Sequence, residues 1–346
     1  MVMQKEITAP GPLLDTRGRL GEAGYSKTPL LEYDRGSVKA GRLRIKEWDY
    51  YLVCNEHYAV ALTVSDNGYM GFISASLVDF DRVYHHTASV TTLLPRGSFH
   101  MPKSSCNGDV SFSSEQCSVS FKNTEQGRRL LCEFKNFKDG KPFTADILLT
   151  DEPEHSMNIA IPFPRAKRAF YYNRKINCMR ASGRAEFNGG VYEFKPDSAF
   201  GTLDWGRGVW TYSNTWYWSS MSGLYKGVPF GFNLGYGFGD TSHATENMLF
   251  YNGQARKLGR VVFNIPKNRD GQYDYLKSWV IGTDDDALHM TFTPILDRAA
   301  KINALVLCSD QHQVFGRFSG TARLDDGTEL KFNDKIGFAE KVKNRW

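Results

Sequence analysis

The sequence predicts an all-β protein of two packed lobes, each a barrel or a sandwich, with few short helices. Aromatic residues make up 14% of the chain, and aromatic side chains suit the half-buried pleated surface of a sheet. The 32 glycines supply the tight turns and bent strands that such folds need. Short apolar runs separated by turn signals, without a sustained helical period, are typical of sandwiches and barrels.

Strand-like pattern begins at Gly41, after a Gly- and Pro-rich lead-in segment over residues 1–35. Turn signals then separate apolar runs, which predicts antiparallel hairpins. These signals are "DNG" (66–68), "KDGK" (138–141), "NGG" (188–190), "YNG" (251–253) and "LDDG" (324–327). Within "PILDRAAKINAL" (294–305) we expect one short turn or helix.

The expected lobes are residues 36–160 and 161–346. The boundary is placed between Pro153 and Lys175 because "IPFP" (161–164) lies there, and Pro-x-Pro does not fit inside a central strand. An aromatic strand beginning at Trp48 has a faint echo at Trp216, about half a chain later. Two similar lobes would produce this echo, and so would shared β composition.

Several classes of function are disfavoured by the composition. The net charge of +5 is spread along the chain, with "RAKR" (165–168) as its densest basic run, so we expect no nucleic-acid partner. No apolar window is long enough for a signal peptide or a membrane span, which predicts a cytoplasmic protein. Neighbouring histidines in "VYHHT" (83–87) face opposite ways on a strand, so we expect no metal. Without a phosphate-binding glycine motif or a nucleophile elbow we expect no cofactor. The oligomeric state is left open.

The richest chemistry lies in "FGTLDWGRGVWTYSNTWYWSS" (200–220), which holds four of the seven tryptophans together with Asp204 and Arg207. In a regular strand over 203–210, Asp204 and Trp210 share one face, and Trp205 and Arg207 share the other. Asp204 therefore meets Arg207 only if "GRG" forms a bulge or turn. Structural ion pairs are common, so we expect Arg207 or backbone N–H groups to hold Asp204 ionised.

A second strand predicts an unusual face. In "VPFGFNLGYGFG" (228–239) the aromatic residues and Leu234 alternate with glycines and Asn233. The glycine face either leaves a hollow or admits a close neighbour, and Asn233 points into that space. The following "DTSHATENMLFYNG" adds His243 and Glu246 as polar candidates.

Three blocks, "GTLDWGRGVWTYSNTWYWSS" (201–220), "FNLGYGFGD" (232–240) and "TENMLFYNG" (245–253), resemble a domain-of-unknown-function family of full-length bacterial and fungal proteins. More distantly the chain is similar to two-lobed lipocalin-like proteins, which include carotenoid 1,2-hydratase and tocopherol cyclase. This resemblance implies two barrel-like lobes with an apolar pocket. In the hydratase branch it implies an alkene-protonating Asp near a Trp-Gly pair. Here "LDWG" has Asp204 directly before Trp205, a different spacing.

Three functions remain in competition. The first is acid–base chemistry of hydratase, cyclase or isomerase type on a small, largely apolar molecule. The second is small-molecule binding without chemistry. The third is a carbohydrate-active hydrolase with Asp204 and Glu246 as its carboxyls. The candidate catalytic residues are Asp204, Arg207 and Glu246, and the candidate ligand-binding residues are Trp205, Trp210, Trp216, Trp218, Asn233, Tyr236 and His243. We predict that Trp210, Trp216, Trp218, Asn233 and Tyr236 surround one cavity.

Overall fold

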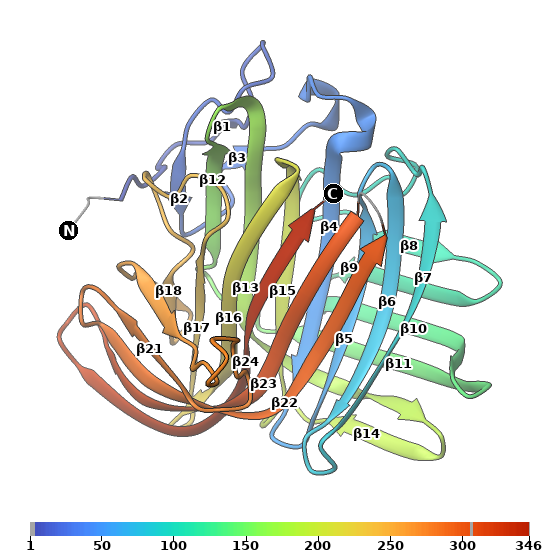
Figure 1. Ribbon diagram of the computed structural model, residues 1–346, viewed down its shortest axis with the longest axis vertical. Coiled ribbons are helices and arrows are strands. Elements are labelled where there is room, and N and C mark those ends of the chain that lie inside the picture. The colour runs from blue at the N-terminus through green and yellow to red at the C-terminus, as the bar shows by residue number, and fades with distance from the viewer. Residues whose placement is uncertain (1–3, 305–306, 346) are drawn as a thin grey trace.

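The all-β, two-lobed fold class predicted from the sequence is confirmed. The computed structural model describes residues 4–304 and 307–345, and 64% of the chain is strand against 2% helix. Two curled antiparallel sheets make up most of the molecule (Figure 1). The helices among these described residues are two single 3₁₀ turns, η1 (Arg35–Ser37) and η2 (Arg42–Arg44), which precede the first long strand.

The first sheet runs in the order β7-β6-β5-β4-β15-β13-β11-β10-β9-β8, with β2, β12 and β14 paired at its side. Its curl brings β10 close to β7 and β8 close to β5. Its strands are β2 (Gly24–Ser26), β4 (Ile45–Cys54), β5 (Tyr58–Asp66), β6 (Met70–Asp79), β7 (Tyr84–Leu93), β8 (Val110–Ser113), β9 (Cys117–Thr124), β10 (Gly127–Lys138), β11 (Lys141–Thr150), β12 (Met157–Phe163), β13 (Ala166–Phe187), β14 (Gly190–Phe194) and β15 (Phe200–Val209).

The second sheet runs in the order β19-β18-β17-β16-β24-β23-β22-β21-β20. Its strands are β16 (Ser213–Tyr225), β17 (Val228–Tyr236), β18 (Met248–Tyr251), β19 (Gln254–Lys257), β20 (Val261–Asn264), β21 (Trp279–Thr283), β22 (Leu288–Ala304), β23 (Leu307–Arg323) and β24 (Glu329–Arg345). A parallel pair of β1 (Gly11–Pro12) and β3 (Leu31–Glu32) lies in the N-terminal segment. All five turn signals connect antiparallel neighbours.

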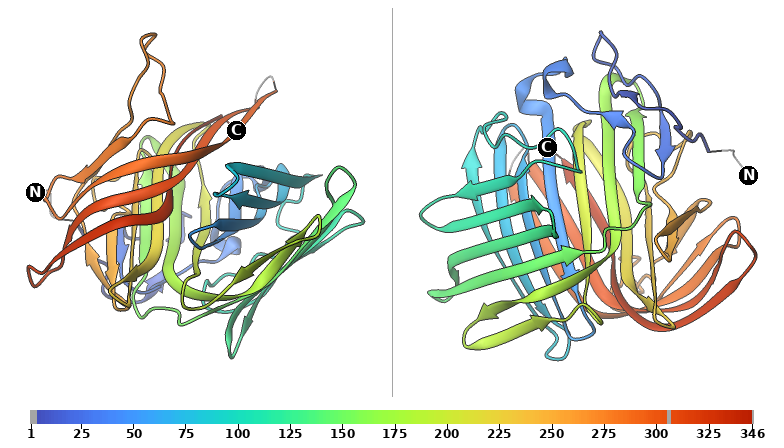
Figure 2. Two further views of the ribbon diagram at one scale, coloured as in Figure 1. Left: turned by 90° about the horizontal axis from the view of Figure 1, so that it is seen from below. Right: turned by 180° about the vertical axis from the view of Figure 1, so that it is seen from behind.

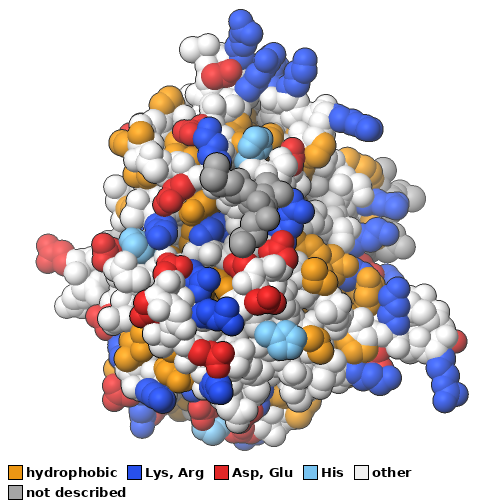
Figure 3. Space-filling view, turned by 90° about the vertical axis from the view of Figure 1, so that its left-hand side faces the viewer, with side chains coloured by type: hydrophobic (Ala, Val, Ile, Leu, Met, Phe, Trp, Pro, Cys, Tyr) orange, Lys and Arg blue, Asp and Glu red, His pale blue; other side chains and the backbone are white. Residues whose placement is uncertain are grey.

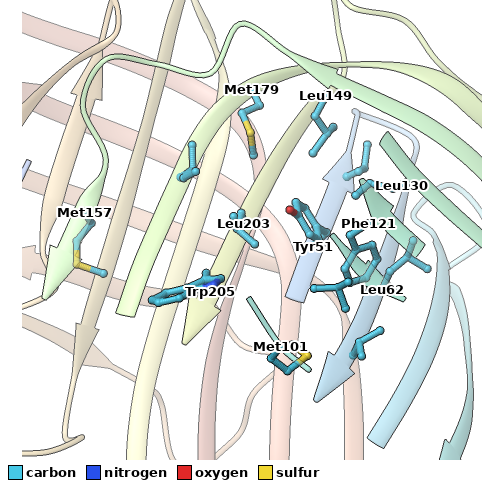
Figure 4. Close-up of a cluster of buried hydrophobic side chains, with 14 of the residues drawn as sticks. Tyr51, Leu62, Met101, Phe121, Leu130, Leu149, Met157, Met179, Leu203 and Trp205 are labelled. Carbon is cyan, nitrogen blue, oxygen red and sulfur yellow. The ribbon is translucent and has the colours of Figure 1, made fainter. Parts of the chain in front are cut away.

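Each lobe fills its own interior with side chains. Several strands of the first sheet contribute side chains to its core, among them Tyr51, Leu62 and Phe121 from β4, β5 and β9, and Leu203 and Trp205 from β15 (Figure 4). A second core, which includes Phe232, Trp279 and Phe292, fills the second lobe. The outer faces carry a third apolar cluster where the lobes meet. Because successive strand residues alternate faces, Tyr51 belongs to the first core and Leu52 belongs to the interlobe cluster.

The chain changes sheets between Val209 and Ser213, which is later than the boundary expected at 153–175. β12 and the first part of the central strand β13 occupy that range, and residues 166–209 pair within the first sheet. Pro162 is accommodated because β12 pairs with β2 only over 158–160, so its missing N–H breaks no bond on that side. Figure 2 shows the two sheets as separate layers of strands. The division into folding units at residue 160 stays a prediction.

The turn or helix expected within 294–305 is wrong, because β22 covers residues 288–304 and pairs with β23 along its length. Leu296 is buried in the interlobe cluster, so tertiary packing overrides the helical propensity of "LDRAAK". Residue 305 lies outside the described residues.

The surface shows no concentration of one charge on the face seen in Figure 3, where Lys and Arg side chains are interspersed with Asp and Glu. None of the helices in the described part of the chain has the length and apolar character needed to cross a membrane.

Candidate functional site

A cavity of about 630 Å³ lies between the outer faces of the two sheets. The first lobe lines it with residues of β4, β5, β6, β7, β13 and β15, and the second with residues of β16, β17, β22, β23 and β24. One part of the lining is aromatic, and the part near β7 and β22 is polar. The cavity thus lies at the interlobe surface, while the interior of each lobe is packed.

Five aromatic side chains form what we call the aromatic box: Trp48, Tyr171, Trp210, Trp216 and Phe238, all of which line the cavity. The Trp210 ring centre lies 5.3 Å from that of Trp48, 6.2 Å from that of Trp216 and 4.9 Å from that of Phe238. Gly206 makes the position of Trp48 possible, since a Cβ there would lie 1.9 Å from the indole Cζ2. Trp48 was not among the sequence candidates.

Asp204 faces the cavity and accepts three hydrogen bonds. Lys175 Nζ lies 2.9 Å from Oδ2, Asn173 Nδ2 lies 2.6 Å from Oδ1, and Trp48 Nε1 lies 3.2 Å from Oδ1. Lys175 is directly opposite Asp204 in the β13–β15 ladder, and its ammonium also sits 3.9 Å from the centre of the Trp218 ring. The partner of Asp204 is therefore Lys175, which the sequence interpretation missed.

Arg207 lies on the other face of β15, inside the first lobe. β15 keeps regular register with β4 along its whole length, so the bulge that would join Arg207 to Asp204 does not form. Arg207 Nη1 instead lies 3.0 Å from Asp49 Oδ1, and the guanidinium also donates to three backbone carbonyls, one of them from Pro102. Trp205 shares this face, with its ring centre 4.2 Å from the guanidinium carbon.

Glu246 lines the cavity beside Gly235, where a Cβ would lie 2.7 Å from the Oε2 atom. The glycine face of β17 therefore admits a close neighbour at this point. Burial raises the pKa of Glu246, Lys175 and the Tyr171 hydroxyl oppose that rise, and the charge of Asp204 adds to it.

Glu340 is a cavity carboxyl that the sequence analysis missed. Trp216 Nε1 donates to its Oε1 atom over 2.9 Å, and Gln313 Nε2 donates to its Oε2 atom over 3.1 Å. Burial raises the pKa of Glu340 to about 7, against the lowering effect of Trp216, Lys175 and Arg298. The sequence pattern could have identified it, because Phe338, Glu340 and Val342 occupy alternate positions of one strand and therefore share a face. A carboxyl on an apolar strand face is buried, as the structure shows.

The charges in this cavity do not balance. Asp204, Glu246 and Glu340 are three carboxyls, whereas Lys175 and Arg298 are the two cations among the described lining residues. Like charges in a poorly solvated space disfavour full ionisation. This repulsion favours retention of a proton on one carboxyl of the group, and the pKa values of Glu340 and Glu246 are both raised, with burial as the largest cause.

Some of the remaining residues predicted to bind a ligand line the cavity, and the others lie behind the lining or away from it. Trp218 and Tyr236 line the cavity with Trp210 and Trp216. Asn233 lies behind them, accepting a hydrogen bond from Trp218 Nε1 over 2.7 Å and donating to the Glu246 carbonyl over 2.9 Å. Trp205 belongs to the first-lobe core, and His243 is absent from the lining.

Two packed lobes of antiparallel sheet with a cavity between them define an all-β protein of two-lobed fold. The chain belongs to the family described as Domain of unknown function (DUF2804), whose model matches residues 4–346. No curated protein matches the sequence.

The comparison with solved structures finds matches at low sequence identity. The chain is similar to a protein named AttH from Nitrosomonas europaea, with 14% identity, a TM-score of 0.57, and coverage of 96% of this chain and 98% of that one. It matches kievitone hydratase from Nectria haematococca with 11% identity, a TM-score of 0.47, and coverage of 87% and 88%. It matches CghA with Sch210972 with 8% identity, a TM-score of 0.41, and coverage of 96% and 97%.

Proposed function

We propose that the chain is an enzyme that transfers a proton to an unsaturated, largely apolar small molecule in the interlobe cavity. Acid-initiated hydration, cyclisation and isomerisation all begin with this step. The observation that carries the proposal is Glu340, a carboxyl with a pKa raised to about 7 that lines an aromatic cavity. A general acid works best when its pKa lies near the operating pH.

These reactions need no reactant besides the substrate and, for a hydration, water. The π electrons of a substrate alkene take the proton of the Glu340 carboxyl, which forms a C–H bond and leaves a cation on the neighbouring carbon. The rings of the aromatic box stabilise such a cation through their negative faces. In a hydration, water then bonds to the cationic carbon and returns its proton to the Glu340 carboxylate. In an isomerisation the cation itself loses a proton to that carboxylate.

Asp204, the strongest sequence candidate for the acid, takes a different role in this proposal. Its carboxylate already accepts bonds from Lys175, Asn173 and Trp48. It therefore holds Lys175 in place and adds negative charge near Glu340, which helps to keep the Glu340 proton bound. The same two residues act on Glu246, whose pKa is lowered by Lys175 and raised by Asp204. Arg207 has a structural role within the first lobe.

A deuterium experiment tests this function without knowledge of the substrate. The purified full chain is incubated in deuterium oxide with an extract of bacterial small molecules, and mass spectrometry follows carbon-bound deuterium. All three reaction types place solvent deuterium on a substrate carbon. We expect enrichment with the wild type and at least a hundredfold less with Glu340→Gln, since losing general acid catalysis costs about 10²–10⁴-fold.

Glu329→Gln is the matched control, because Glu329 lies on the same strand with 44% of its side chain exposed and outside the cavity lining. It should retain wild-type enrichment. Deuterium enrichment that survives Glu340→Gln would contradict the acid role. A ligand that is retained in native mass spectra, with no enrichment by the wild type, would favour the non-catalytic binding protein. A small apolar ligand and a cytoplasmic location remain predictions from the sequence.

A further inference from the structure

We propose that Arg298 binds a carboxylate group of the substrate, so that the substrate class is an unsaturated apolar molecule carrying one carboxylate. This inference rests on the proposed function, because it names the substrate of the same cavity. It concerns a residue on β22 that the sequence analysis did not single out.

The Arg298 guanidinium lines the cavity without an ion-pair partner. Its Nη1 donates to Ser76 Oγ over 2.6 Å and its Nη2 donates to Gln313 Oε1. Within residues 4–304 and 307–345 no carboxylate lies within ion-pair distance of it. A guanidinium has five N–H donors, so three are uncommitted to the described side chains. The two bonds fix the plane of the group and leave a donor on each nitrogen.

Gln313 connects this anchor to the proposed acid. The side-chain amide accepts from Arg298 through Oε1 and donates to Glu340 Oε2 through Nε2 over 3.1 Å. Gln313 is 1% exposed, so both contacts are shielded from bulk water. One amide group thus separates the guanidinium from the carboxyl, and an anion held at Arg298 brings the adjoining carbon skeleton to Glu340.

The surroundings of Arg298 are polar, in contrast to the aromatic box. Ser76 shares a hydrogen bond of 2.8 Å with Thr87, and His85 lies two residues from Thr87 on the same face of β7. The His85 Nδ1 atom is buried and has no hydrogen-bond partner among the described residues. Burial and the charge of Arg298 lower the pKa of His85, so a neutral ring is left to accept or donate one bond. A ligand with an apolar ring system and one polar end fits a cavity that is aromatic in one part and polar around Arg298.

A carboxylate fits this site better than a phosphate. The planar fork of a single guanidinium satisfies both oxygens of a carboxylate, whereas a phosphate bound by the same fork has further oxygens that need more donors. A bound anion also acts on the acid. Arg298 lowers the pKa of Glu340, and a carboxylate at Arg298 offsets that effect. Substrate binding would therefore keep the Glu340 proton in place until the transfer.

A matched pair of probes tests the anchor: anthracene carboxylate and anthracene methanol, which share the ring and differ in the charged group. Binding to the full chain is followed by quenching of tryptophan fluorescence. We expect the wild type to bind the carboxylate about tenfold more tightly than the alcohol, in line with a charge-assisted pair. Arg298→Gln should abolish this preference and leave the affinity for the alcohol within twofold of wild type.

Arg298→Lys keeps the positive charge and loses the planar fork, so it should retain part of the preference for the carboxylate probe. It also provides a second test of the anchor if Arg298→Gln does not fold. Arg317→Gln is the control, since Arg317 lies on β23 outside the cavity lining, and it should behave as wild type. Equal wild-type affinity for both probes overturns the carboxylate anchor while leaving the proposed function intact. Arg298→Gln losing both probes alike also overturns it. Failure of both probes to bind the wild type overturns the anchor, and the deuterium experiment then decides the proposed function separately.

Discussion

Lys175 Nζ lies 2.9 Å from Asp204 Oδ2, and the two residues face each other directly across the β13–β15 ladder. The same ammonium acts on two further carboxyls, because Lys175 lowers the pKa of both Glu246 and Glu340. A single buried cation is thus shared by the three acids of the cavity, and substitutions there should be coupled.

Lys175→Met should lower the free energy of unfolding by about 3–5 kcal/mol, since it leaves Asp204 buried without its counter-ion. Asp204→Asn added to Lys175→Met should recover much of that loss. Urea denaturation of the two single variants and the double variant gives the coupling energy. Strictly additive single effects would show that the pair does not act as a unit.

Glu340→Gln should remove a pH dependence from the stability. The folded pKa of about 7 lies above the ordinary value of 4.5, so the folded state binds more protons between these values. Stability contributed by this group is fully present below about pH 4.5 and is lost as the pH rises through about 7. The loss is on the order of 3 kcal/mol.

Urea denaturation of wild type and Glu340→Gln from pH 5 to pH 8 measures this difference. The wild type should lose stability relative to the variant as the pH rises, with Glu329→Gln tracking the wild type. Parallel curves for wild type and Glu340→Gln would mean that Glu340 titrates in its ordinary range.

Gly206→Ala should disturb the aromatic box, because the added Cβ would lie 1.9 Å from Trp48 Cζ2. We expect a loss of about 1–3 kcal/mol from overpacking and weaker binding of anthracene methanol. Gly41→Ala is the control, since nothing lies within 4 Å of its Cβ position. Trp48→Phe in the Gly206→Ala background should recover stability, and unchanged melting of Gly206→Ala would place Trp48 elsewhere.

Arg207→Met should destabilise the first lobe by about 3–5 kcal/mol, because Asp49 would remain buried without its partner. Asp49→Leu added to Arg207→Met should restore much of the stability. The affinity of the folded protein for the probes should be unchanged, since Arg207 on β15 and Asp49 on β4 both lie outside the cavity lining. An Arg207→Met variant that folds normally but does not bind the probes would show that Arg207 contributes to the binding site.

The sequence predicted the fold class and the hairpins because these depend on local pattern. The alternation of side chains along a regular strand also placed Asp204 and Arg207 on opposite faces. This is what the structure shows, because β15 keeps regular register with β4. Nearness in sequence then favoured Arg207 as the partner, whereas the true partner, Lys175, comes from the neighbouring strand β13. Pairing between strands is set by tertiary structure, which local pattern does not reveal.

Because local pattern does not reveal strand pairing, the sequence analysis also missed the cavity residues of the second lobe, Glu340 and Arg298. Glu340 reaches the cavity because β24 pairs with β16 and places Glu340 opposite Trp218. Arg298 reaches it through the β22–β23 ladder, where it lies opposite Gln313. The β16–β24 pairing and the contact of Arg298 with Ser76 join segments far apart in the chain, so the tryptophan-rich stretch alone identified only one wall of the cavity.

The pairing of β4 with β15, which joins residues 45–54 to residues 200–209, has a consequence for biosynthesis. The strands β4 to β7 form a local meander that can assemble early, but its β4 edge stays open until β15 has left the ribosome. Such non-local pairing slows folding and exposes an unpaired strand to other chains meanwhile. We therefore expect nascent chains in which β15 has not left the ribosome to recruit chaperones or aggregate, and chains in which β15 has left it to become resistant to proteases over the first sheet.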